Sequence, residues 1–247
     1  QIMIVEQLPP KFEKRLSDFV LTLRNLLGAD LKSIILYGSA ARGEFDPRRS
    51  DLNLLVVLDR VDFHHLSLLA PHTRKWSRKR IATPLVLSPQ YIATALDAYP
   101  LEFLEMQSAR RVLFGEDVLA DINPPLQAVR RQCEQEARGK LLHLREILLE
   151  TALKPRHLKQ AIILSVPSFI RIGRHILRLQ GQEPKVHANE VIEGLRNSTQ
   201  LPLQGLEAAW GIKEGSRKPS RGEIANLFET YLNDTVAITN FVDTLKV

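Results

Sequence analysis

The chain carries the segment LYGSAARG at residues 36–43, followed by SDLNLLVV at residues 50–57, and these two stretches decide its fold. Residues 31–37 are mostly apolar, as a buried strand requires. Gly38 follows at once, and glycine accepts the positive φ of a tight turn and lets the backbone approach a ligand closely. We therefore expect a strand, a turn at Gly38 and a short helix that ends at Gly43.

The second segment predicts another buried strand. Leu52 and residues 54–58 form an apolar run that is typical of a strand covered on both faces. Asp51 and Asn53 are two residues apart, so their side chains point to the same side of that strand. Pro47 lies in the connection and prevents the preceding short helix from continuing. Two polar side chains are therefore expected near the Gly38 turn.

These residues resemble the nucleotidyltransferase superfamily of the DNA polymerase β type, and most closely its bacterial antibiotic and minimal nucleotidyltransferases. The family pattern is Gly-Ser, then Asp-x-Asp, then a third carboxylate on a later strand. Gly38, Ser39 and Asp51 match this pattern, whereas Asn53 stands in place of the second aspartate. Residues 111–117, RVLFGED, resemble the end of the family's domain.

The resemblance implies transfer of a nucleoside monophosphate from an NTP, with ATP expected, to a hydroxyl of a small molecule or a protein. The residues that it implies for phosphate binding are Gly38, Ser39, Arg42 and Ser50. Asp51 and Asn53 would hold Mg²⁺, which usually takes one or two carboxylates together with substrate phosphates. Because the amide of Asn53 carries no charge, we predict reduced activity. The alternative is an inactive relative that binds a nucleotide or a protein partner.

Two segments could supply the third carboxylate. Residues 83–87, TPLVL, are expected to form a strand and contain no acid. Residues 102–113 are expected to form the last strand, and they offer Glu102 or Glu105. These two positions have opposite parity along a strand, so at most one of them would face the site. The alternative is that both are surface glutamates.

The chain is predicted to contain two domains. Residues 1–120 form the nucleotidyltransferase-like domain, and the composition changes at residues 121–125, DINPP. Residues 121–247 are expected to form an α-helical bundle, as in the antibiotic-modifying relatives, and the fold class is therefore α+β with a small mixed sheet. The expected helices span residues 9–27, 63–79, 89–98, 126–153, 155–179, 184–195, 202–210 and 223–245.

Composition limits the class of protein. The 247 residues are 44% hydrophobic and 25% charged, which is typical of a soluble protein with substantial cores. No apolar run approaches the ~20 residues that span a bilayer, and residues 1–10 do not resemble a signal peptide. We therefore expect a cytoplasmic location and no membrane partner, and a homo-oligomer stays open. The lone Cys133 excludes an internal disulfide.

Two further patterns suggest partners. Residues 74–80, RKWSRKR, surround Trp76 with basic side chains, and a basic run beside an aromatic residue can bind nucleic acid. Such a run is more often the solvated face of a helix, so nucleic acid is the less favoured partner. His64 and His65 follow Asp62 and suggest a metal site. Adjacent helical residues diverge by about 100°, which favours a solvated helix instead.

Overall fold

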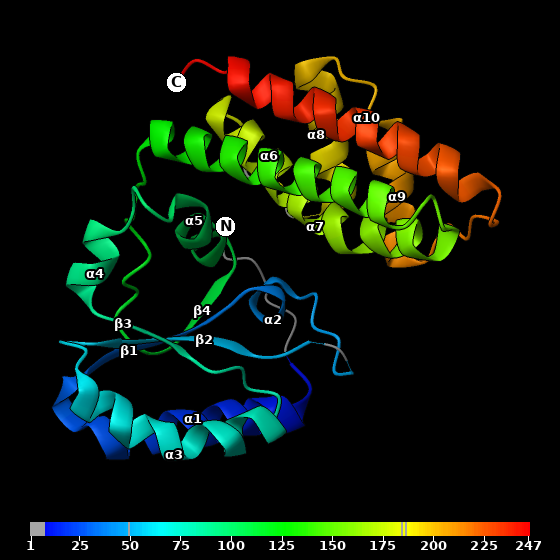
Figure 1. Cartoon of the computed structure of the whole chain (residues 1–247). Coiled ribbons are helices and arrows are strands. Elements are labelled where there is room, and N and C mark those ends of the chain that lie inside the picture. Colours follow the sequence, from blue (N-terminus) through cyan, green and yellow to red (C-terminus); the bar gives the residue numbers. More distant parts are fainter. Residues whose placement is uncertain (1–7, 49, 184, 186) are drawn as a thin grey trace. The chain divides into compact units, whose positions relative to one another are not determined.

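The apolar segments on either side of the Gly38 turn pair with each other in a four-stranded sheet (Figure 1). The computed structural model describes residues 8–48, 50–183, 185 and 187–247. Within them the strands are β1 (Leu31–Tyr37), β2 (Asn53–Leu58), β3 (Leu85–Leu87) and β4 (Arg110–Gly115), in the order β3-β2-β1-β4. β1 runs antiparallel to β2 and β4, and β3 runs parallel to β2. The predicted small mixed sheet is confirmed.

Helices cover both faces of this sheet. Helices α1 (Pro10–Leu27) and α3 (Phe63–Arg78) lie on one face, where the core includes Phe19, Leu23, Ile34, Val56 and Trp76 (Figure 1). Helices α4 (Pro89–Thr94) and α5 (Pro100–Ser108) lie on the other, where the core includes Ile35, Leu55, Val57 and Phe103. The two middle strands are therefore covered on both faces, as their largely apolar sequences predict.

One predicted strand is a helix. Residues 100–108 form α5, and β4 begins only at Arg110, although a strand was expected from residue 102. Pro100 explains the start of the helix, because proline is favoured in the first turn. The expectation that Glu102 and Glu105 face opposite ways was wrong, since residues three apart on a helix share a face.

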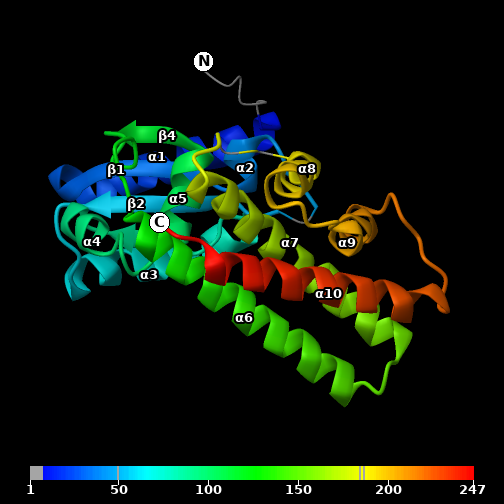
Figure 2. The same cartoon turned by 90° about the horizontal axis from the view of Figure 1, so that it is seen from above.

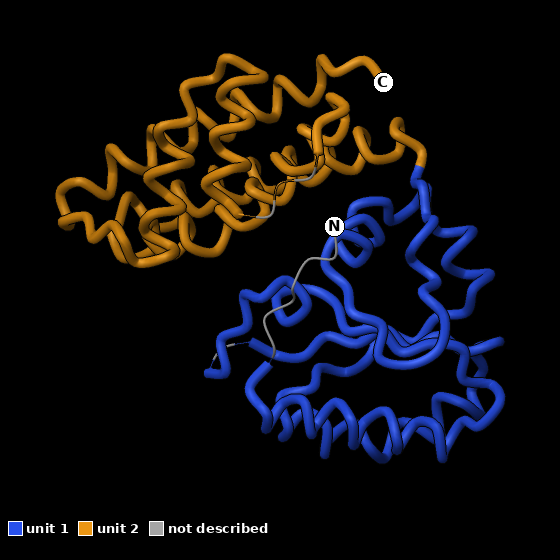
Figure 3. The backbone as a smooth tube through the Cα atoms, turned by 180° about the vertical axis from the view of Figure 1, so that it is seen from behind, with its two compact units in different colours: residues 1–124 blue, residues 125–247 orange. Residues whose placement is uncertain are grey.

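The chain divides into two compact units, residues 1–124 and 125–247 (Figure 3). The second unit contains α6 (Leu126–Glu150), α7 (Pro155–Leu179), α8 (Ala188–Thr199), α9 (Gln204–Glu214) and α10 (Glu223–Thr244). Helix α7 contacts the other four, and α6, α7 and α10 run alongside one another (Figure 2). The predicted helical bundle is confirmed. Among the described residues, none of the helices combines the length and apolarity needed to cross a membrane.

Candidate functional site

The register of β1 and β2 brings the Gly38 turn onto Asn53. Tyr37, the last residue of β1, pairs with Asn53, the first residue of β2. Gly38 follows with φ 79° and ψ −149°, a conformation that favours glycine. A Cβ added at Gly38 would lie 3.3 Å from Nδ2 of Asn53. The turn and the altered motif residue are therefore in contact.

Helix α2 (Ser39–Arg42) starts directly after this turn. It is a single turn long and ends at Gly43, as predicted, and Gly43 adopts the left-handed conformation. The N–H groups of Ser39 and Ala40 have no partner within the helix, because the first N–H groups of any helix lack one. The dipole of so short a helix is small, so anion binding here would depend on N–H groups and charged side chains.

Asp51 lies two residues before the first residue of β2 and forms an ion pair with Arg80. Arg80 Nη1 is 3.4 Å from Asp51 Oδ1, and the same guanidinium donates to the carbonyl of Arg48. The backbone reinforces this contact, because the Leu52 N–H donates to the Arg80 carbonyl at 2.8 Å. Arg80, two residues after the end of α3, is therefore joined to the segment before β2 through both its side chain and its main chain.

Ser50 helps to close the loop before Asp51. Its hydroxyl accepts a hydrogen bond from the Asp46 N–H at 3.0 Å, and its own N–H donates to the Asp46 carbonyl at 2.7 Å. The Asp46 carboxylate in turn accepts from the Arg48 N–H at 2.8 Å. These bonds shape the approach to Asp51, while phosphate binding by Ser50 stays a prediction.

Arg42 joins α2 to α5. Its Nη2 lies 3.1 Å from Oε2 of Glu105, and its Nη1 lies 3.8 Å from Oε2 of Glu44. The Arg42 and Glu105 side chains are only 15% and 19% exposed, so this pair is substantially shielded from water. Glu102 lies one turn earlier on α5 and is half-buried. Glu105 therefore fixes the position of Arg42, and the catalytic roles of Glu102 and Glu105 stay predictions.

The residues at this edge do not fit a magnesium site built on paired carboxylates. In the register of β2 and β3, Leu85 pairs with Leu55, so β3 presents a leucine on the face that Asn53 and Leu55 share. Among the described residues, no group of three or more His, Cys, Asp or Glu is placed to hold a metal ion. The available ligands are the neutral amide of Asn53 and the carboxylate of Asp51, which already faces Arg80.

Part of the chain is similar to a known protein family. Residues 14–105 match the family model described as nucleotidyltransferase domain. This part of the chain therefore carries a nucleotidyltransferase domain. The fold of the chain is similar to that of spectinomycin adenyltransferase AAD(9) from Enterococcus faecialis, crystallised with ATP and spectinomycin, at 13% identity and a TM-score of 0.54. This match covers 91% of the chain and 99% of that structure, and no curated protein matches.

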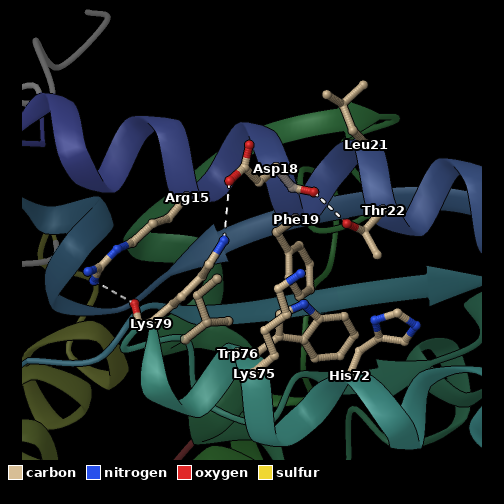
Figure 4. Close-up of a pocket in the computed structure, with 10 residues that line it drawn as sticks. Arg15, Asp18, Phe19, Leu21, Thr22, His72, Lys75, Trp76 and Lys79 are labelled. Atoms are coloured by element: carbon tan, nitrogen blue, oxygen red, sulfur yellow. Dashed lines mark hydrogen bonds and ion pairs between the residues drawn. The ribbon is translucent and has the colours of Figure 1, made fainter.

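The basic segment of the nucleotidyltransferase domain does not present an aromatic ring for base stacking. Trp76 is only 4% exposed and packs against Phe19, with ring centroids 4.8 Å apart. The rings of Phe19 and Trp76 line a pocket between α1 and α3, with a volume of ≈ 230 Å³, and Figure 4 shows the residues around it. Lys79 lies 3.2 Å from Asp18 across this pocket. The aromatic part of the nucleic-acid hypothesis is therefore wrong, since Trp76 belongs to the core.

The predicted solvated helix face is also wrong for His65 of this domain. His65 is 3% exposed, and carboxylates contact both of its ring nitrogens. Nδ1 lies 2.7 Å from Asp62 and Nε2 lies 3.2 Å from Asp30. The hydrogen bond with Asp30 raises the pKa of His65, with a further contribution from Asp62, against the opposing effect of burial.

Sequence reasoning missed Arg80 as a residue of the site. It was grouped with the basic segment because its neighbours are basic. Only the three-dimensional structure shows that Arg80 belongs to the site. Ile81 forms a parallel β-bridge with Leu52, and this bridge places Arg80 beside Asp51. This pairing joins segments about thirty residues apart, and the sequence of neither segment indicates which segment it pairs with.

Proposed function

We propose that the nucleotidyltransferase domain binds a nucleoside triphosphate at the Gly38 turn and slowly transfers a nucleoside monophosphate to a hydroxyl of a small molecule. The observation that carries the proposal is the contact of Gly38 with Asn53, two residues after Asp51. The family match supports this reaction class. The fold likeness to an adenyltransferase crystallised with ATP and spectinomycin favours ATP as donor and a small, hydroxyl-bearing acceptor.

The proposed reaction assigns roles to the charged groups near the Gly38 turn, where β1 ends and β2 begins. The acceptor hydroxyl oxygen attacks the α-phosphorus, pyrophosphate leaves, and the hydroxyl proton passes to the carboxylate of Asp51. The N–H groups at the Gly38 turn and the guanidinium of Arg80 bind the phosphate oxygens, since arginine donates to phosphate in a fixed fork. Glu105 acts indirectly, because it fixes the position of Arg42 on α2.

Slow transfer follows from the ligand set. Paired metal ions can stabilise both the attacking and the leaving oxygen of such a displacement. The residues here offer Asn53 and a carboxylate that already faces Arg80, so this stabilisation is weakened. The same observation favours a second candidate, a domain that binds the nucleotide without transferring it.

Transfer from ATP labelled in its α-phosphate to a panel of hydroxyl-rich small molecules, spectinomycin included, tests the proposal. We expect slow product formation that Asp51→Ala abolishes, because the variant loses the proton acceptor. Asp97→Ala, a change of another exposed aspartate, serves as the control and leaves the rate unchanged. Unchanged transfer in Asp51→Ala would remove Asp51 from the mechanism.

Measurement of pyrophosphate release distinguishes the two candidate functions. Steady release of pyrophosphate by the wild-type chain with any NTP would end the binding-only candidate. Nucleotide binding without any release, across the whole acceptor panel, would instead support it.

A further inference from the structure

We propose that the site binds a nucleoside triphosphate without needing a divalent cation, because Arg80 supplies positive charge from the protein itself. In the family pattern, two carboxylates would attract a metal ion to this position. Here one of the two is the neutral Asn53, and the other, Asp51, faces a guanidinium. The inference rests on the proposed function, since it concerns the same nucleotide site.

The geometry leaves Arg80 able to reach a ligand. Its Nη1 lies 3.4 Å from Asp51 Oδ1, and the side chains of Arg80 and Asp51 are 39% and 51% exposed. A guanidinium carries five N–H donors, so contacts with Asp51 and the Arg48 carbonyl do not exhaust them. The same side chain can therefore hold Asp51 and meet phosphate oxygens.

The backbone at Arg80 shows that the arginine occupies a position better suited to glycine. Its φ is 62°, in the left-handed region, and it follows Lys79, the C-cap residue of α3. The Arg80 N–H donates to the Ser77 carbonyl and the Ile81 N–H to the Trp76 carbonyl, each at 3.0 Å, which holds this conformation. A glycine would fit here with less strain. The backbone conformation at Arg80 therefore does not favour an arginine, and its guanidinium nevertheless lies beside Asp51.

The charge balance points the same way. The net charge of the Asp51–Arg80 pair is zero, and the side chains of Asn53 and Leu85 are uncharged. The nearby Glu105 carboxylate lies against Arg42. A divalent cation therefore meets no uncompensated pair of carboxylates, whereas Mg²⁺ binding usually depends on one or two of them. A triphosphate anion meets a guanidinium instead of a negative cluster.

Calorimetric titration of the full chain with a non-hydrolysable ATP analogue, once in EDTA and once in Mg²⁺, tests the inference. For the wild type we expect dissociation constants within about threefold of each other. Arg80→Gly should weaken binding in EDTA by at least about tenfold. Its thermal midpoint should be no lower than that of the wild type, since glycine accepts the left-handed backbone, so a loss of binding cannot be ascribed to unfolding.

Two further variants complete the design. Arg78→Ala removes the same charge from an exposed position two residues earlier on α3, and binding should not change. Asn53→Asp restores the second carboxylate, so binding should weaken in EDTA and become at least about tenfold tighter in Mg²⁺ than in EDTA.

The outcomes separate the inference from the proposed function. Wild-type binding that requires Mg²⁺ would overturn the inference and leave the nucleotide site in place. Arg80→Gly binding as tightly as the wild type in EDTA would overturn the role of Arg80. No binding under either condition would overturn the proposed function, and the inference with it.

Discussion

Asn53 and Gly38 touch at the point where the phosphate is proposed to lie, and this contact makes the turn sensitive to a single methyl group. A Cβ at Gly38 would lie 3.3 Å from the Asn53 amide, and the φ of 79° strains any other residue. Gly38→Ala should therefore lower the free energy of unfolding by roughly 1–2 kcal/mol and weaken nucleotide binding at least about tenfold. Denaturant unfolding and calorimetry measure the two effects.

Gly28 offers a matched control for this substitution. Its φ is also positive, at 53°, but a Cβ there meets nothing within 4 Å. Gly28→Ala should cost similar stability and leave nucleotide binding unchanged. Equal loss of binding in both variants would show that the effect at Gly38 is one of general stability.

His65 makes the stability of the nucleotidyltransferase domain depend on pH. Contact with Asp30 and Asp62 raises its pKa in the folded state. The stabilisation is therefore complete below the unfolded pKa of about 6.5 and is lost as the pH rises through the higher folded value. We expect the urea midpoint of unfolding to decrease as the pH is raised from 6 to 9. This dependence of the midpoint on pH should be absent from His65→Gln.

The exposed neighbour His64 provides the comparison for this pH effect. His64→Gln should keep the wild-type slope, because its ring is solvated. The other charges near the cluster are Arg60, 3.6 Å from Asp62, and the Lys32–Asp59 pair at 3.6 Å, and both are unchanged in His65→Gln. A slope that persists in His65→Gln would contradict the assignment.

At the scale of elements, α9 and α10 are packed so closely that one glycine sets their separation. A Cβ at Gly205 would lie 2.4 Å from the backbone carbonyl carbon of Thr230 and from the N of Tyr231. Gly205→Ala should therefore force the two helices apart and cost about 1–3 kcal/mol of unfolding free energy. Denaturant titration followed by circular dichroism measures the loss.

Gly139 in the middle of α6 is the matched comparison. It is exposed, and a Cβ there meets nothing within 4 Å. Gly139→Ala should stabilise the bundle by about 0.5–1 kcal/mol, because alanine loses less entropy in a helix. If Gly205→Ala were as stable as Gly139→Ala, the close approach of α9 and α10 would be refuted.

The elements that could be predicted are those whose pattern of apolar residues fits either the period of a strand or that of a helix, but not both. The largely apolar sequences of β1 and β2 and the long apolar stripes of α6, α7 and α10 are of this kind. The segment LEFLEM at residues 101–106 is not, because its apolar residues suit a strand and a helix alike. Packing of Leu101, Phe103, Leu104 and Met106 into the core decides for the helix.

Across the whole molecule, the sequence predicted which segments build the site but not which cations face its carboxylates. Gly38 lies against Asn53 because β1 ends at Tyr37, which pairs with Asn53 at the start of β2. The Arg80 contact and the Arg42–Glu105 pair bridge segments 29 and 63 residues apart, and only the fold selects such partners. The division of the chain near residue 124 coincides with a Pro-Pro sequence, a signal that is local.

A crystal soaked with a non-hydrolysable ATP analogue tests most directly whether the nucleotide lies at the Gly38 turn. We predict density for the triphosphate beside Gly38 and Asn53, with the Arg80 guanidinium on its oxygens. Density in the pocket between α1 and α3, or a Gly38 edge that stays empty at saturating analogue, would contradict the assignment.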